Sequence, residues 1–202
     1  MDFTLLAFPA FTLIVIASLL LLVTRDNRWS ILALVFQYLG AFLLIGIHWS
    51  LEMAASVLIA GWMACLILGV SILETIHLTG GSWQEKHQIS PSGSLFRLIT
   101  AALALLTVYS LAPRIVSRLP GGNLIQVWGC LILVALGVLQ LGLTSSPTRV
   151  IMGLFTILLG FEVFYAALES SMLVAGLLAF VTLGLAMIGA YLVVAPAMEE
   201  AG

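Results

Sequence analysis

The sequence predicts an all-α, polytopic membrane protein with about seven transmembrane helices, and composition is the first reason. Of its 202 residues, 62% are hydrophobic and only 8% are charged, and the mean hydropathy is +1.23. A soluble domain is usually about 45–50% apolar and about 25% charged. Because so few ionised groups cannot cover a globule in water, we expect the lipid bilayer to surround most of this chain.

The second reason is a series of apolar runs, each close to the ~20 residues that a helix needs to cross a bilayer. The first run follows Asp2, where a cleaved signal peptide would carry positive charge, so we expect it to be a span. Two longer loops, 74–94 and 113–124, contain Gly, Pro and Ser, and no length remains for a separate soluble domain. The expected spans are 3–24, 30–48, 53–73, 95–112, 125–143, 149–168 and 172–194.

The distribution of basic residues predicts the orientation of these spans. With seven crossings, one side of the membrane collects five basic residues and the other side only Arg114 and Arg118. Cytoplasmic loops are enriched in Lys and Arg, so we expect the N-terminus outside and the C-terminus in the cytoplasm. The five residues on the expected cytoplasmic side are Arg25, Arg28, Lys86, Arg97 and Arg149.

The sequence contains little that would support catalysis, a cofactor or a nucleic acid. Cys65 and Cys130 lie inside apolar runs, and no basic block, phosphate-binding loop or nucleophile–base pair is present. His77, Glu85 and His87 share one polar loop, but their spacing matches no metal-ligand motif. We therefore expect no catalytic residue, no bound metal or cofactor and no nucleic-acid partner.

One acidic residue lies far from any span end. Glu162 follows Arg149 by thirteen residues and precedes Glu169 by seven, which places it about 20 Å from the cytoplasmic end of its helix. No other span offers a Lys, Arg or His at comparable depth. A charged carboxylate at the bilayer centre costs at least about 2.5–3.5 kcal/mol on insertion scales. Glu162 is therefore expected to be protonated, or to have a partner supplied by another subunit or by a water-filled path.

Intramembrane acids commonly belong to proton relays, which makes Glu162 the candidate relay residue. Gln37 is the only other deep polar side chain that we expect to join it, since Gln126 and Gln140 fit interhelical hydrogen bonding better. Gly153 and Gly160 lie on the same span and would allow a neighbouring helix to approach closely. The alternative is a neutral Glu162 that forms hydrogen bonds with the backbone, Thr156, Tyr165 or a glutamine.

The chain also resembles itself. The segment from Arg28, RWSILALVFQYLGAFLLIG, and the segment from Arg149, RVIMGLFTILLGFEVFYAAL, each follow an apolar span and a turn, and each precede an acidic turn and another span. Spans one to three and five to seven then form two parallel three-helix units. The expected division is 1–73, a cytoplasmic loop with a connecting helix over 74–124, 125–194, and a tail over 195–202.

The second unit carries a family resemblance. Its sequence LGLTSSPTRVIMGLFTILLGFEVFYAAL resembles the K-type membrane subunit of respiratory complex I and the C-type subunit of multisubunit sodium/proton antiporters, in which a mid-membrane Gly-x-Glu corresponds to Gly160, Phe161 and Glu162. The whole chain is similar to component E of hydrogenase-4 and formate hydrogenlyase complexes. In that family, the Arg-to-Glu interval matches that from Arg149 to Glu162, and a Gln follows an Arg by nine residues, as Gln37 follows Arg28.

The resemblance implies a prokaryotic inner-membrane subunit that lies between antiporter-like subunits and a quinone- or hydrogenase-module junction. In that role Glu162 would belong to a hydrated axis that couples redox energy to proton or sodium movement. Three departures reduce the match: the last span has no acid, Cys65 lies where component E tends to have a Lys, and Ala41 takes the position equivalent to Glu162.

Two other functions remain open at this point. The chain would have a purely structural role if it only seals the membrane arm of such a complex. A stand-alone secondary transporter is compatible with parallel repeats, although transporter sites usually have broken helices and several convergent polar groups at the midplane. Only Glu162 and Gln37 fit that description here.

Overall fold

The computed structural model describes residues 3–24, 26–78, 91–118, 123–144 and 146–201. Within these ranges the chain forms seven α-helices and no β-strand. Each helix is long and apolar enough to cross a membrane, which confirms the expected polytopic all-α class. The helices are α1 (Phe3–Val23), α2 (Asn27–Ile45), α3 (Leu51–Leu78), α4 (Pro91–Val116), α5 (Leu124–Gly142), α6 (Pro147–Leu168) and α7 (Met172–Ala201).

Several helices differ in length from the apolar runs that predicted them. The expected loop over 74–94 is helical at both ends, since α3 continues to Leu78 and α4 begins at Pro91. Similarly, α7 continues from the expected span end at 194 to Ala201. Hydropathy marks only the part of a helix inside the bilayer core, whereas backbone hydrogen bonding continues into the water beyond it. In contrast, α2 ends at Ile45, before a short turn over residues 46–49.

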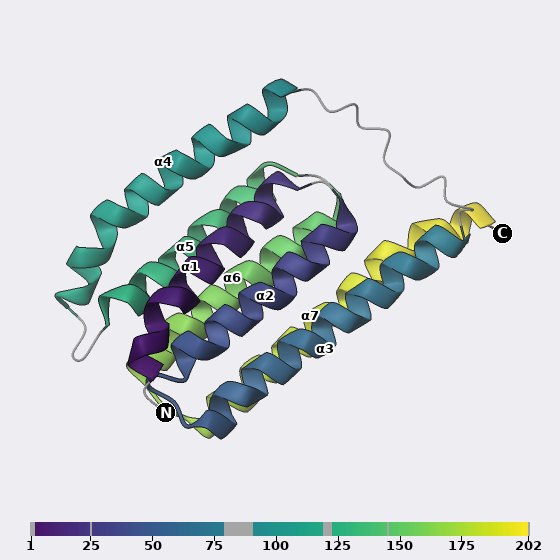
Figure 1. Ribbon diagram of the computed structural model, residues 1–202. Coiled ribbons are helices and arrows are strands. Elements are labelled where there is room, and N and C mark those ends of the chain that lie inside the picture. The colour runs from purple at the N-terminus through teal and green to yellow at the C-terminus, as the bar shows by residue number, and fades with distance from the viewer. Residues whose placement is uncertain (1–2, 25, 79–90, 119–122, 145, 202) are drawn as a thin grey trace.

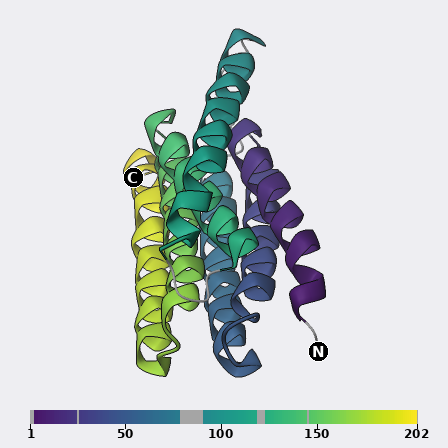
Figure 2. The same cartoon turned by 90° about the vertical axis from the view of Figure 1, so that its left-hand side faces the viewer.

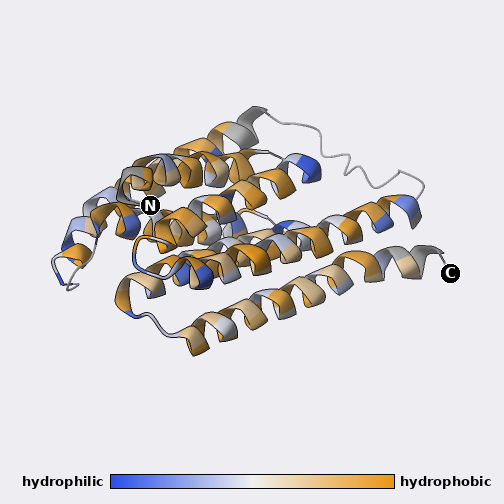
Figure 3. Cartoon of the chain, turned by 60° about the horizontal axis from the view of Figure 1, so that its bottom comes forward, coloured by the Kyte–Doolittle hydropathy of each residue, from blue (hydrophilic) through white to orange (hydrophobic). Residues whose placement is uncertain are grey.

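Hydrophobic residues cover the helices along most of their length, and hydrophilic residues gather toward the helix ends (Figure 3). The N-terminus and the C-terminus lie at opposite ends of the bundle (Figure 1), as an odd number of crossings requires. The chain is therefore a multi-pass membrane protein. Which end faces the cytoplasm stays a prediction from the basic residues.

The two groups of three helices pack in the same order. In the first group α2 contacts α1 and α3, and in the second α6 contacts α5 and α7. Each helix also contacts its counterpart, so that α1 packs on α5, α2 on α6, and α3 on α7. Figure 1 shows α3 and α7 side by side along most of their length, next to the group formed by α1, α2, α5 and α6.

The connecting helix α4 lies at the outside of the bundle, where it packs mainly on α5 (Figure 2). Only 17% of its apolar segment Leu95–Val116 is buried, which is less than in any other span. Arg97 of α4 donates one hydrogen bond to the Leu22 carbonyl at 3.2 Å and another to the Leu143 carbonyl at 3.5 Å. These carbonyls belong to the C-terminal ends of α1 and α5, so Arg97 ties the connecting helix to the first helix of both groups.

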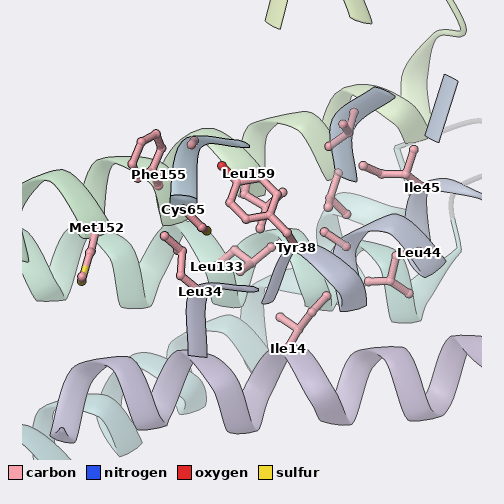
Figure 4. Close-up of a cluster of buried hydrophobic side chains, with 14 of the residues drawn as sticks. Ile14, Leu34, Tyr38, Leu44, Ile45, Cys65, Leu133, Met152, Phe155 and Leu159 are labelled. Carbon is pink, nitrogen blue, oxygen red and sulfur yellow. The ribbon is translucent and has the colours of Figure 1, made fainter. Parts of the chain in front are cut away.

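The largest hydrophobic core is formed by buried residues of α1, α2, α3, α5, α6 and α7. Figure 4 shows Tyr38 of α2 in this cluster together with Cys65, Leu133 and Leu159. At one end of the bundle, the Trp49 indole N–H donates to the Glu169 carbonyl at 2.8 Å and links the α2–α3 turn to the α6–α7 turn. This hydrogen bond therefore holds the two turns together at the same end of the bundle.

Candidate functional site

The candidate site is centred on Glu162 in α6. Its side chain is only 1% exposed, although Glu is rarely buried in proteins unless it is paired. Thr182 of α7, itself buried, places its hydroxyl oxygen 3.3 Å from Oε1 of Glu162. The other carboxyl oxygen, Oε2, has no hydrogen-bond partner among the described residues. The site thus brings together a carboxyl group and a hydroxyl group from two neighbouring helices.

The Thr182 hydroxyl has a second partner, and this limits how the pair can share hydrogens. Its oxygen lies 3.0 Å from the Leu178 carbonyl and 3.3 Å from Glu162 Oε1, but a hydroxyl has only one hydrogen to donate. When that hydrogen points to Leu178, the oxygen can only accept a hydrogen from a protonated Glu162. When it points to Glu162, it supports an ionised carboxylate. The pair can therefore accommodate both protonation states by rotation of one hydroxyl.

A second buried polar cluster joins three helices through Gln37. The Gln37 amide nitrogen donates to the Ser18 hydroxyl of α1 at 2.8 Å, and the Thr156 hydroxyl of α6 lies 3.3 Å from Gln37 Oε1. All three side chains are at most 2% exposed. Thr156 also donates to the Met152 carbonyl of its own helix at 2.9 Å. Gln37 is thus the centre of a cluster that links α1, α2 and α6.

Both clusters use α6, where Thr156 and Glu162 are six residues apart, or about 9 Å along the helix axis. Tyr38 follows Gln37 on α2, and its fully buried hydroxyl makes no hydrogen bond to a described residue. One cluster joins α1, α2 and α6 and the other joins α6 and α7, and no hydrogen bond among the described residues links the two. The Glu162 carboxyl group can bind and release a proton, whereas the described residues of these clusters do not include the nucleophile–base pair needed for group transfer.

The two arginines that precede the equivalent spans occupy different environments. Arg28 is exposed, and its backbone N–H donates to the N-cap residue Asp26 at 3.0 Å. Arg149 is only 6% exposed, and its carbonyl accepts a hydrogen bond from the Gln140 amide at 3.3 Å. Neither arginine is near the Glu162 carboxyl by sequence position, since both lie in the first turn of their helices. Both arginines therefore lie at the N-terminal ends of their helices, away from the Glu162 carboxyl group.

Gln126 and Gln140 both make the interhelical contacts expected of them. The Gln126 amide donates to the Val163 carbonyl at 3.1 Å, which joins α5 to α6 next to Glu162. Gly160 and Gly153 lie at the same interface. A Cβ atom on Gly160 would lie 2.9 Å from the Leu133 Cβ and 3.0 Å from the Cys130 carbonyl, closer than atoms normally approach.

Thr182 and Ser18 contribute to the two polar clusters although the sequence did not single them out. Each is a hydroxyl-bearing residue inside an apolar span, and this is the signal that could have found them. The partners considered for a neutral Glu162 were the helix backbone, Thr156, Tyr165 or a glutamine. Among the described residues its side chain instead contacts Thr182, and none of those four forms a hydrogen bond with it. Of the possible metal site, His77 lies exposed on α3, and Glu85 and His87 lie outside the described residues.

No model of a known protein family, no curated protein and no solved structure matches this chain. Its function is therefore inferred from its own residues and from the resemblance described above. Within the described ranges, no group of three or more His, Cys, Asp or Glu side chains could hold a metal ion.

Replacing Gln37 with Leu is expected to lower the thermal stability of the protein. The substitution removes the contacts with both Ser18 and Thr156, and an interhelical hydrogen bond in a membrane contributes about 0.6 kcal/mol on average. We expect a loss of about 1 kcal/mol, measured as a lower unfolding midpoint in detergent. Ser56→Ala is the control, since Ser56 bonds only the Met53 carbonyl of its own helix. A Gln37→Leu protein as stable as this control would show that the cluster contributes nothing.

Proposed function

We propose that this chain is a non-catalytic membrane-arm subunit of a complex I-related, redox-driven ion-translocating complex, such as a membrane hydrogenase or oxidoreductase. The observation that carries the proposal is the Glu162 carboxyl group, which is buried inside a transmembrane helix, six residues before its end at Leu168, without an ion pair to any described residue. In the proposed role Glu162 takes up and releases the translocated proton, or the site serves sodium in the same position.

Three features of the site support this role. The Thr182 hydroxyl can turn between two acceptors and so support Glu162 in either protonation state. The Gln37 cluster adds polar groups deeper toward α1. The interval from Arg149 to Glu162 is also the one on which the resemblance to K-type and component E subunits is based. Ionisable residues inside membrane spans are rare and typically mark ion pathways or proton relays, which supports a functional hypothesis for Glu162.

The outer surfaces of the bundle support membership in a larger complex. Long apolar faces of α4 and α7 are exposed, including Phe96, Leu106, Phe180 and Ile188. In the proposed complex, the antiporter-like subunits and the quinone- or hydrogenase-junction subunits cover part of these faces, and lipid covers the rest. The complex would lie in the prokaryotic inner membrane, with the C-terminus of this subunit in the cytoplasm.

A structural role is the second candidate, and the Thr182 contact is the observation that favours it. Glu162 has a hydrogen-bond partner within its own chain, so it can be accommodated as a neutral, immobile group. In that case the chain would seal the membrane arm without carrying ions. The substitutions described in the Discussion separate this role from the relay.

The proposal is tested by purifying the tagged chain from its own cells in a mild detergent and identifying its neighbours by mass spectrometry. We expect large antiporter-like subunits and iron–sulfur subunits of a peripheral arm to co-purify with it. A lone monomer or homodimer that transports a solute in liposomes would overturn the proposal in favour of a secondary transporter.

A further inference from the structure

The oxygen atoms around Glu162 determine which ion its carboxyl group can hold. Glu162 is 1% exposed within its own chain, so a neighbouring subunit would have to open the bundle to supply a ligand. Among the described residues, the Thr182 hydroxyl is the group that hydrogen-bonds the carboxyl group, and Oε2 has no such partner. The side chains at this site therefore offer the two carboxyl oxygens and one hydroxyl oxygen.

The backbone carbonyls of the two helices do not add to these oxygens. Transporters coordinate Na⁺ with carbonyl oxygens at points where a transmembrane helix is broken or unwound. Here α6 is continuous through Glu162 and α7 is continuous through Thr182, so the carbonyls beside them accept hydrogen bonds within the helix. The Leu178 carbonyl also lies 3.0 Å from the Thr182 hydroxyl, which donates to it in one of its two orientations.

The surroundings of the Glu162–Thr182 pair are apolar and offer little that could hold water around an ion. The residues one turn away include Leu159 and Ala166 on α6, and all four neighbours of this kind named here are at most 7% exposed. The two on α7 are Leu178 and Ala186. A buried water molecule typically makes about three hydrogen bonds to polar groups, and aliphatic side chains provide none.

The other titratable groups of the surrounding core are phenols and thiols, neither cations nor carboxylates. They come from α2, α3, α5 and α6, and they are Tyr38, Cys65, Cys130 and Tyr165. Glu162 itself forms no ion pair with a described residue. A second acidic group that would help to bind a metal cation is therefore not present among the described residues of this core.

The first half of the chain does not supply an ion site of the same kind. A shift of 121 residues aligns Ala41 with Glu162 and Gly61 with Thr182, so neither equivalent side chain has an oxygen atom. The buried cluster around Gln37 contains amide and hydroxyl groups but no acid that would balance the charge of a cation. The Glu162–Thr182 pair is thus the place in the described bundle where an ion can be held by a buried acid.

We infer that the Glu162–Thr182 pair binds a proton and excludes Na⁺. A proton adds to one carboxylate oxygen and makes a neutral acid, which donates to the Thr182 oxygen while that hydroxyl donates to Leu178. When the proton leaves, the Thr182 hydroxyl turns to the carboxylate. A metal cation must instead replace its hydration shell with several oxygen ligands, which the pair lacks. This assignment rests on the proposed function and decides between the two ions that it leaves open.

The first test is labelling of Glu162 in whole native membranes by an apolar carbodiimide, followed by mass spectrometry. The reagent reacts with protonated carboxyl groups, whereas bound Na⁺ would keep the carboxylate ionised and slow the reaction. Labelling is measured across a pH series in NaCl and, as the matched control for ionic strength, in KCl of the same concentration. We expect the labelling rate to fall as the pH rises and to be the same in the two salts.

The second test compares Thr182→Val with Thr107→Val. Val keeps the shape of Thr and removes the hydroxyl, and Thr107 is the matched control because it is exposed on α4 and bonds the Leu103 carbonyl of its own helix. A hydrogen bond to a charged group is stronger than one to a neutral group, so its loss favours the protonated acid. We expect Thr182→Val to be labelled about tenfold faster at alkaline pH, in both salts. Thr107→Val should match the unmodified chain.

The possible results separate this assignment from the proposed function. Slower labelling in NaCl than in KCl would overturn the assignment and leave sodium as the ion of the proposed relay. An unchanged labelling profile in Thr182→Val would refute the part given to its hydroxyl. Normal pumping in Glu162→Gln would refute the proposed function, while the two salts still show which ion the site binds. If Thr182→Val does not assemble, the salt comparison on the unmodified chain decides the question.

Discussion

Glu162→Gln is expected to reduce ion translocation by the complex to background while the complex still assembles. Gln keeps the size of the side chain and can still form a hydrogen bond with Thr182, but it has no proton to release. The measurement is the pH gradient or sodium uptake that redox turnover produces in membrane vesicles. Glu169→Gln is the matched control, because Glu169 is an exposed acid at the end of the same helix.

A second substitution separates the relay from the structural role. Glu162→Ala removes the proton and also leaves the Thr182 hydroxyl without its interhelical partner. If Glu162→Gln assembles and pumps like the unmodified protein while Glu162→Ala fails to assemble, the side chain has a structural role only. If both variants assemble and neither pumps, the relay explains the result.

Gly160→Ala is expected to have the largest effect on stability. An added Cβ would lie 2.8 Å from Val134 Cγ2, 2.9 Å from Leu133 Cβ and 3.0 Å from the Cys130 carbonyl oxygen. Because two of these atoms are fixed to the backbone of α5, α5 and α6 must move apart, and overpacking of this kind costs typically about 1–3 kcal/mol. The expected result is a clearly lower unfolding midpoint in detergent, or loss of the assembled complex.

Gly184→Ala provides the control for that substitution. Gly184 also lies inside a transmembrane helix, α7, but apart from its chain neighbours and its own helix backbone no atom of the described residues lies within 4 Å of the position that its Cβ would take. Ala is favoured over Gly in helices by about 1 kcal/mol, so this variant should be as stable as the unmodified protein or more stable. Equal stability of Gly160→Ala and Gly184→Ala would contradict the close packing of α5 on α6.

The membrane class and the positions of the seven spans were predictable because both depend on local properties. A bilayer requires each crossing segment to be apolar and about 20 residues long, and it requires the backbone to satisfy its own hydrogen bonds, as a helix does. Counting along the sequence was also enough to place Glu162 inside the sixth helix, six residues before its end at Leu168. The helix ends were less predictable, since α3 and α7 continue well beyond their apolar segments.

The sequence by itself determined that the chain crosses the membrane seven times and that one carboxyl group lies deep inside a span. Only the tertiary structure decided which hydroxyl groups reach that carboxyl group, and that the Tyr38 ring lies on Gly61. The physical reason is that lipid and protein interior are both apolar, so hydropathy does not show which side of a helix faces inward. Leu32 is 48% exposed and Leu34 is 0% exposed, although the two residues are identical and lie two positions apart on α2.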